Sequence, residues 1–243
     1  MRLAGNLAGL AAILTLVVVA ASAAIRLGAN ELGGAMVIAR GVHRAAASLA
    51  ALLVLGSFWR ALRIDALRRP ASAAFILMLA LSVVGWATGI QPPPAAALFN
   101  QLGGIALAAL LAWIAGRAAR GNGGPPADRA LAHVALVFAA LQIVFGAALV
   151  LPGDAVAPVL LMAHAVSGLA AAAIGAALGA GLVGSGAARG AAWLLVCALL
   201  TPLAGILSVL PAPALAIQVG HAAAAALLIC ALAHAHASMS ASA

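Results

Sequence analysis

Six histidines are the side chains of this sequence with the widest scope for chemistry, and three of them lie inside long apolar segments. His43, His164 and His221 each lie about six to eight residues inside one end of such a segment. At a helical rise of ~1.5 Å per residue, all three would lie roughly 10 Å below a membrane surface. An ionisable side chain at that depth is costly, so its presence indicates a functional site.

Neutral imidazole is a good axial ligand for haem iron, and helix bundles build cofactor sites from side chains on facing helices. We therefore predict that His164 and His221 ligate a haem iron. Small residues share the helical faces of both histidines and would leave room for a flat macrocycle, although they also suit close helix packing. The alternative role for His164 and His221 is a hydrogen bond between their two helices. The small residues are Gly168, Ala171 and Gly175 after His164, and Ala225 after His221.

The remaining histidines and the two cysteines predict no metal site. His133, His234 and His236 lie near predicted helix ends, where histidine is ordinary. Cys197 and Cys230 lie in apolar runs without metal-ligand spacing, so we expect buried thiols. Zinc usually needs three or four ligands, and no cysteine or acid lies at the depth of the deep histidines.

The elements that position these residues must be membrane-spanning helices. Of the 243 residues, 67% are hydrophobic and 7% are charged, whereas soluble domains average about 45–50% and ~25%. This composition excludes a soluble globular domain, a disordered chain and a disulfide-rich secreted module, and it predicts an all-α polytopic membrane protein. Arginine, proline and glycine divide the chain into eight predicted spans: 5–25, 37–59, 71–90, 95–116, 130–151, 157–183, 191–210 and 213–236.

Arginine placement predicts the orientation of these spans. The chain has 12 basic residues, all arginine, and four acids. Nine arginines fall on one side, which we predict to be cytoplasmic together with both termini, and we ascribe the high charge to topology rather than to nucleic-acid binding. Arg26, Arg40 and Arg44 fall on the other side, where they would either snorkel to lipid headgroups or hold an anionic group such as a carboxylate. The nine are Arg2, Arg60, Arg63, Arg68, Arg69, Arg117, Arg120, Arg129 and Arg189.

The two halves of the chain resemble each other, which predicts two four-helix bundles, residues 1–120 and 121–243. Spans two and six each carry a deep histidine, His43 and His164. Spans four and eight share an Ala-Ala-Leu-Leu sequence at 108–111 and 225–228. Four helices per half would preserve orientation, so the repeat would be parallel, about an axis along the membrane normal.

Several short motifs together resemble the haem A synthase family of cytochrome oxidase assembly proteins, over nearly the whole chain. That family has eight spans in two similar four-helix halves, with one histidine on the second and one on the fourth helix of each half. The motifs are Val42-His43-Arg44, Asn100-Gln101-Leu102-Gly103-Gly104, the segment 141–146, Ala163-His164, and the segment from Gly205 through Pro211 and His221 to Leu228.

The resemblance implies oxidation of a methyl group that converts haem O to haem A in a bacterial cytoplasmic membrane. His164 and His221 would ligate a haem b in the C-terminal half. His43 would belong to the substrate haem site of the N-terminal half, where Arg44, with Arg26 or Arg40, would meet the propionates. Haem O synthase or a terminal oxidase complex would be the protein partner, beside membrane lipid.

The N-terminal half departs from the family pattern. Residues 95–116 contain no histidine, so Asn100 or Gln101 is the nearest polar substitute for the second ligand. The family usually has Glu where Arg40 stands, which leaves Glu31 and His43 as the catalytic candidates. Two further hypotheses therefore stand beside the enzyme: a non-catalytic haem-carrying assembly factor of a terminal oxidase, and a bis-histidine electron-transfer b cytochrome. A small-solute transporter is disfavoured because broken-helix signals and buried acids are lacking.

Overall fold

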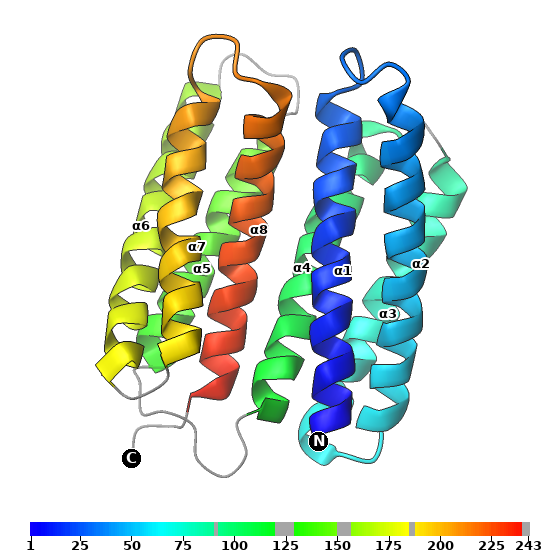
Figure 1. The fold of residues 1–243 in the computed structure, drawn as a ribbon, viewed down its shortest axis with the longest axis vertical. Helices are drawn as coiled ribbons and strands as arrows, with labels where there is room; N and C mark the ends of the chain where they lie inside the picture. The colour runs from blue at the N-terminus through cyan, green and yellow to red at the C-terminus, as the bar shows by residue number, and fades with distance from the viewer. Residues whose placement is uncertain (90–91, 120–128, 150–156, 185–187, 240–243) are drawn as a thin grey trace.

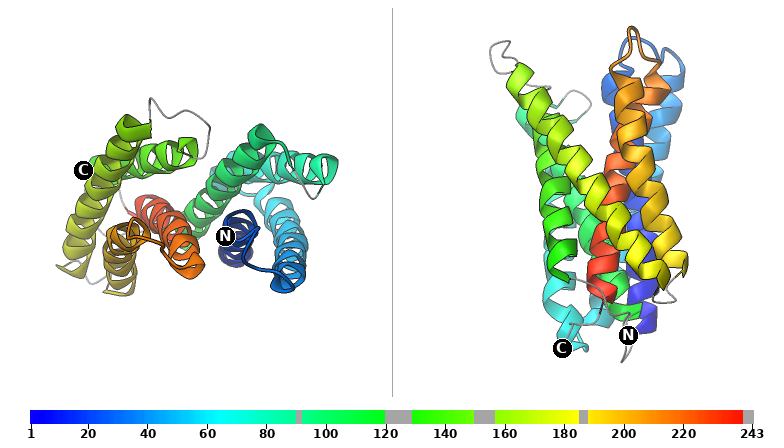
Figure 2. Two further views of the ribbon diagram at one scale, coloured as in Figure 1. Left: turned by 90° about the horizontal axis from the view of Figure 1, so that it is seen from above. Right: turned by 90° about the vertical axis from the view of Figure 1, so that its left-hand side faces the viewer.

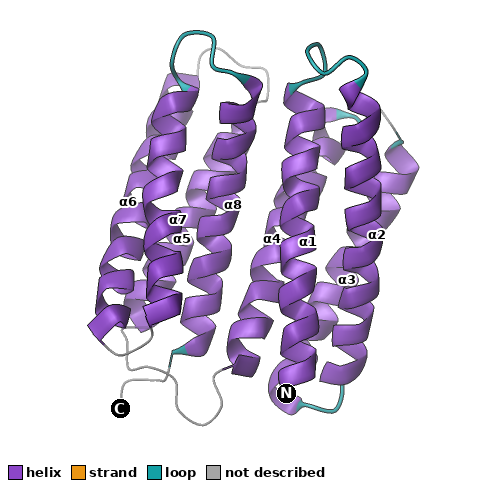
Figure 3. Ribbon diagram, in the orientation of Figure 1, coloured by secondary structure: helices purple, strands orange, loops and turns teal. Residues whose placement is uncertain are grey.

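The computed structural model describes residues 1–89, 92–119, 129–149, 157–184 and 188–239 (Figure 1). The regular structure within these ranges is α-helical throughout (Figure 3). The helices are α1 (Arg2–Leu27), α2 (Ala35–Ala61), α3 (Asp65–Thr88), α4 (Pro94–Ala119), α5 (Arg129–Ala148), α6 (Ala157–Gly184), α7 (Ala188–Ser208) and α8 (Leu215–Ser238).

These eight helices are each long and apolar enough to cross a membrane, so the predicted all-α, multi-pass fold is confirmed. Their outer faces carry large apolar side chains, among them Trp86 at 87% exposed and Val37 at 74% exposed. Water-soluble monomers seldom expose apolar patches on this scale. The hydrocarbon of a bilayer is the solvent that suits these faces.

The start of α3 differs most from prediction, because the helix begins at Asp65 and not at residue 71. Pro70 was expected to precede the helix, yet it lies inside it. Pro70 is the sixth residue of this helix, so it removes one N–H bond, the one to Ala66, and its ring crowds that same carbonyl. Asp65 favours the earlier start, since a carboxylate stabilises the first turn and this one pairs with Arg68 at 3.5 Å. Arg68 therefore belongs to a helix and not to the connection.

The helices pack as two closed rings of four. In the first ring α1 and α3 each contact both α2 and α4, and in the second ring α5 and α7 each contact both α6 and α8. Figure 2 shows the two rings side by side when the molecule is viewed from above. α8 joins them through contacts with α4 and α1. The predicted internal repeat between the rings remains a prediction.

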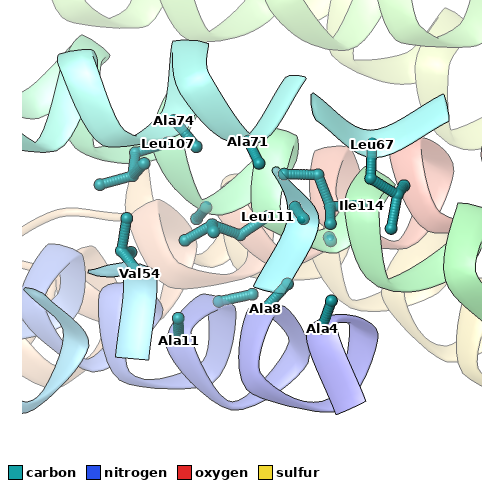
Figure 4. Close-up of a cluster of buried hydrophobic side chains, with 14 of the residues drawn as sticks. Ala4, Ala8, Ala11, Val54, Leu67, Ala71, Ala74, Leu107, Leu111 and Ile114 are labelled. Carbon is teal, nitrogen blue, oxygen red and sulfur yellow. The ribbon is translucent and has the colours of Figure 1, made fainter. Parts of the chain in front are cut away.

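Small residues allow the helices to approach closely. A Cβ atom at Gly116 of α4 would overlap the backbone carbonyl of His234 on α8, so the two rings meet backbone to backbone there. Within the first ring, a buried cluster combines alanines of α1 and α3 with larger side chains of α2, α3 and α4 (Figure 4). Such small-residue contacts provide the van der Waals packing that holds helices together in lipid. The cluster includes Ala4, Ala8, Ala11, Val54, Leu67, Ala71, Ala74, Leu107, Leu111 and Ile114.

The two ends of the molecule differ in charge. We call the end that carries the N-terminus and the α2–α3 connection the inner end, and the end that carries the α1–α2 and α7–α8 connections the outer end (Figure 1). Seven arginines lie at the inner end, whereas Arg26, Arg40 and Arg44 lie toward the outer end. The seven belong to α1 to α5 and to the α2–α3 connection; they are Arg2, Arg60, Arg63, Arg68, Arg69, Arg117 and Arg129. Arg120 and the side chain of Arg189 lie outside the described residues, as do Asp128 and Asp154.

Candidate functional site

His164 of α6 and His221 of α8 meet inside the second ring. Their Nε2 atoms lie 3.4 Å apart, and their imidazole rings stand nearly perpendicular, with centroids 5.6 Å apart and an angle of 86° between the planes. α6 and α8 occupy opposite corners of the ring, and α6 diverges from α7 toward the outer end (Figure 2). His164 and His221 lie six to seven residues after the starts of α6 and α8. They therefore meet in the half of the ring that lies toward the outer end. The structure thus brings the two predicted residues into contact, whereas their ligation of a haem iron stays a prediction.

Backbone contacts fix the His164 ring. Its Nδ1 lies 2.7 Å from the carbonyl oxygen of Gln142 on α5. A carbonyl only accepts, so Nδ1 carries the proton and donates it. This leaves Nε2 of His164 unprotonated, so it can accept a hydrogen bond from the Nε2–H of His221, which is the alternative role considered for this pair. On His221, Nδ1 is buried and forms no hydrogen bond with the described residues. The pair thus has one oriented ring and one ring with a polar atom left unsatisfied.

Glycines make space for both rings. A Cβ atom at Gly146 of α5 would lie 2.7 Å from Cε1 of His164, and one at Gly205 of α7 would lie 3.1 Å from Cε1 of His221. Neither position tolerates a side chain without moving an imidazole. Sequence reasoning assigned no role to these glycines, although both lie within motifs of the family resemblance.

The small residues that follow His164 serve helix packing. A Cβ atom at Gly168 would lie 3.0 Å from the buried side chain of Gln142, and Ala171 is completely buried in the core of the second ring. Gly175 faces leucines of α8 at ordinary contact distance. Of the two interpretations of this stripe, close packing is the one that the structure supports.

The donor set of the pair fits a haem iron. His164 and His221 would hold the iron through their Nε2 atoms, which face each other at 3.4 Å. The hydrogen bond from His164 Nδ1 to a backbone carbonyl is the supporting contact that metal-bound histidines almost always make. Among the described side chains, no group of three or more His, Cys, Asp and Glu residues could hold a metal ion. The pair therefore suits a metal that brings its own equatorial ligands, as haem does.

The first ring contains a different polar group near its outer end. Arg26 of α1 donates from Nη1 to Oε1 of Gln101 on α4. The Nε of Arg26, the Oδ1 of Asn100 and the Nδ1 of His43 are buried and form no hydrogen bond with described residues. His43 makes no ring contact with a second histidine among the described residues. Gln101, one of the two substitutes for the missing ligand, is thus occupied by Arg26.

The other candidates of the first ring lie toward its surface. Arg40 is half-buried, whereas Arg44 and Glu31 are exposed. Within the described ranges the ion pair is the one between Asp65 and Arg68 at the inner end, so Glu31 pairs with none of these arginines. The structure does not bring Glu31 or Arg44 into a closed site with His43.

The remaining histidines and cysteines lie as expected. The rings of His133 on α5 and His236 on α8 are 6.3 Å apart near the inner end, where Arg129 Nη2 also donates to the carbonyl of Met239. Cys197 and Cys230 are buried free thiols, as predicted.

Comparison of the chain with protein-family models and with characterised proteins finds no match.

Proposed function

We propose that this chain is an integral membrane protein that binds haem b in its second helical ring, with His164 and His221 as the axial ligands of the iron. The observation that carries the proposal is the pair of Nε2 atoms, which face each other from opposite corners of the ring at 3.4 Å. Bound there, the haem would supply one-electron redox chemistry in a site of low dielectric.

The chain's own contribution is orientation and exclusion of water. Gln142 holds His164 in the tautomer whose Nε2 is free to bind a metal. The two imidazoles are half-buried, and the core of alanine and leucine that contains Ala171 and Leu228 begins about two helical turns farther along α6 and α8, where it closes that side of the pair to water. A dry environment strengthens the influence of axial ligands and neighbouring dipoles on a redox potential.

The fuller proposal, from the family resemblance, is that the protein oxidises haem O to haem A. In that case a substrate haem would lie in the first ring beside His43, with Arg26, Arg40 and Arg44 toward its propionates. The half-buried position of Arg26 and its unsatisfied Nε support an anionic group at this end. Haem O synthase or a terminal oxidase would then be the functional partner, in a bacterial cytoplasmic membrane.

A second candidate function is that of a single-haem protein, either an electron-transfer b cytochrome or a haem-carrying assembly factor. Two observations in the first ring favour it: His43 makes no ring contact with another histidine in the described chain, and Gln101 is already bound by Arg26.

Absorption spectroscopy of the purified protein tests the proposal of haem binding. We expect a six-coordinate b-type spectrum that is lost in His164→Ala and in His221→Ala and retained in His43→Ala. Haem retained in both His164→Ala and His221→Ala would exclude the proposed ligand pair.

Chromatography of extracted haems separates the two functions. Co-expression with a source of haem O yields haem A if the protein is the oxidase of that substrate, and His43→Ala then abolishes haem A while haem b remains bound. Haem b alone in the wild type identifies the single-haem function.

A further inference from the structure

The hydrogen bond of His164 depends on Gly146, a residue that has no side chain. In α5 the carbonyl of Gln142 already accepts the N–H of Gly146, four residues later in the helix. The imidazole of His164 approaches the same oxygen from the side, with Nδ1 at 2.7 Å. The side chain that would cover this carbonyl belongs to position 146, because helical side chains four residues apart lie on one face.

Glycine at 146 leaves that approach open. A Cβ atom there would lie 2.7 Å from Cε1 and 2.8 Å from Nδ1 of His164. Ordinary contacts between such atoms are about 3.5–4 Å, so a methyl group would push the ring away by most of an ångström. A hydrogen bond lengthened from 2.7 Å by that amount reaches about 3.5 Å, where it is essentially lost.

The second imidazole repeats this arrangement. Gly205 of α7 lies four residues after Thr201, and the ring of His221 lies against Gly205 and faces the backbone of Thr201. A Cβ atom at Gly205 would lie 3.4 Å from Nδ1 of His221, which is farther than the equivalent distance at Gly146. Here Nδ1 does not yet form a hydrogen bond. The same spacing of carbonyl and glycine thus occurs beside both histidines, with a hydrogen bond at His164 and none at His221 among the described residues.

We propose that Gly146 is a positioning residue for His164: its missing side chain opens the Gln142 carbonyl to Nδ1, and this contact presents Nε2 unprotonated toward His221. Gly205 leaves the corresponding approach to the backbone of Thr201 open beside His221. The consequence for haem rests on the proposed function, whereas the tautomer of His164 rests on these contacts alone.

Nuclear magnetic resonance of the haem-free protein, labelled with ¹⁵N in the histidine rings, tests the tautomer directly. His164 is assigned by comparison with His164→Gln. We expect His164 to be protonated on Nδ1 in the wild type and in Gly181→Ala, a matched control on α6 with open space around its Cβ position. In Gly146→Ala the ring should shift toward the tautomer protonated on Nε2. Protonation of wild-type His164 on Nε2 would overturn the inference, even if Gly146→Ala does not fold.

Titration with haemin tests the consequence for the proposed function. Loss of a hydrogen bond that supports a metal ligand typically weakens metal binding about 10–100-fold. Gly146→Ala should therefore have a dissociation constant for haemin that is higher than that of Gly181→Ala by this factor. Its reduction potential should move in the positive direction, because an imidazole without its hydrogen bond is a weaker donor to oxidised iron. Unchanged affinity, potential and tautomer in Gly146→Ala would refute the positioning role. A wild type that shows the expected tautomer but binds no haemin would refute the proposed function instead.

Discussion

The Nε2 atoms of His164 and His221 lie 3.4 Å apart although their helices stand at opposite corners of a four-helix ring. The two imidazoles thus connect α6 with α8 across the interior of the ring. If a haem iron were held here, one bond from each Nε2 to the metal would replace the direct contact between the two imidazoles.

Haem binding should stabilise the folded protein, because the ligand binds only where both histidines are in place. At a free haemin concentration 100 times the dissociation constant, the gain is about 2.7 kcal/mol. We expect the midpoint of thermal unfolding to rise by several degrees in the wild type and in His43→Ala, measured in detergent. No rise is expected in His164→Ala, and an equal rise there would place the haem elsewhere.

Replacement of Gly116 should separate the two rings. A Cβ atom at this position would overlap the carbonyl of His234, and backbone cannot move aside as a flexible side chain can. Overpacking typically costs about 1–3 kcal/mol, so Gly116→Ala should lower the unfolding midpoint clearly.

The matched control for Gly116 is Gly41→Ala on α2, where the added methyl group meets nothing within 4 Å. There the gain in helix propensity, about 0.4–1 kcal/mol, should leave stability unchanged or improved. Equal unfolding midpoints for the two variants would contradict the close approach of α4 and α8.

The contact between Arg26 and Gln101 should be energetically coupled. Gln101→Leu removes the acceptor of the half-buried Arg26 guanidinium and should lower the free energy of unfolding by about 1–3 kcal/mol. In the background of Arg26→Met the same change should cost less, because no buried charge is left unpaired. A double-mutant cycle of unfolding free energies should yield a coupling of about 0.5–2 kcal/mol, whereas additive effects would show that the two side chains act independently.

The orientation can be tested with engineered cysteines, since Cys197 and Cys230 are 2% and 6% exposed and should not react. Asn30→Cys lies in the exposed α1–α2 connection at the outer end, and Leu62→Cys lies in the α2–α3 connection at the inner end. In intact spheroplasts a membrane-impermeant maleimide should label position 30 and not position 62. Lysed cells should label both, and the reverse pattern in spheroplasts would invert the topology.

The sequence by itself determined the number and type of elements, because eight apolar runs separated by arginine, proline and glycine permit little other than spanning helices. It also identified His164 and His221, since an ionisable side chain in an apolar run is conspicuous. Helix ends were less certain: Pro70 reads as a boundary along the chain, whereas Asp65 and its pairing with Arg68 support an earlier start.

Only the tertiary structure decided which groups surround the histidines. The hydrogen-bond partner of His164 is a backbone carbonyl. Every residue has such a carbonyl, so the residue types in the sequence do not indicate which one is used. The role of Gly146 appears only when the ring of another helix lies against it, since a glycine in an apolar run reads equally well as a packing residue. In the first ring, the bond between Arg26 and Gln101 joins residues 75 positions apart, so only the packing of α1 on α4 could reveal that this substitute for the missing ligand is already engaged.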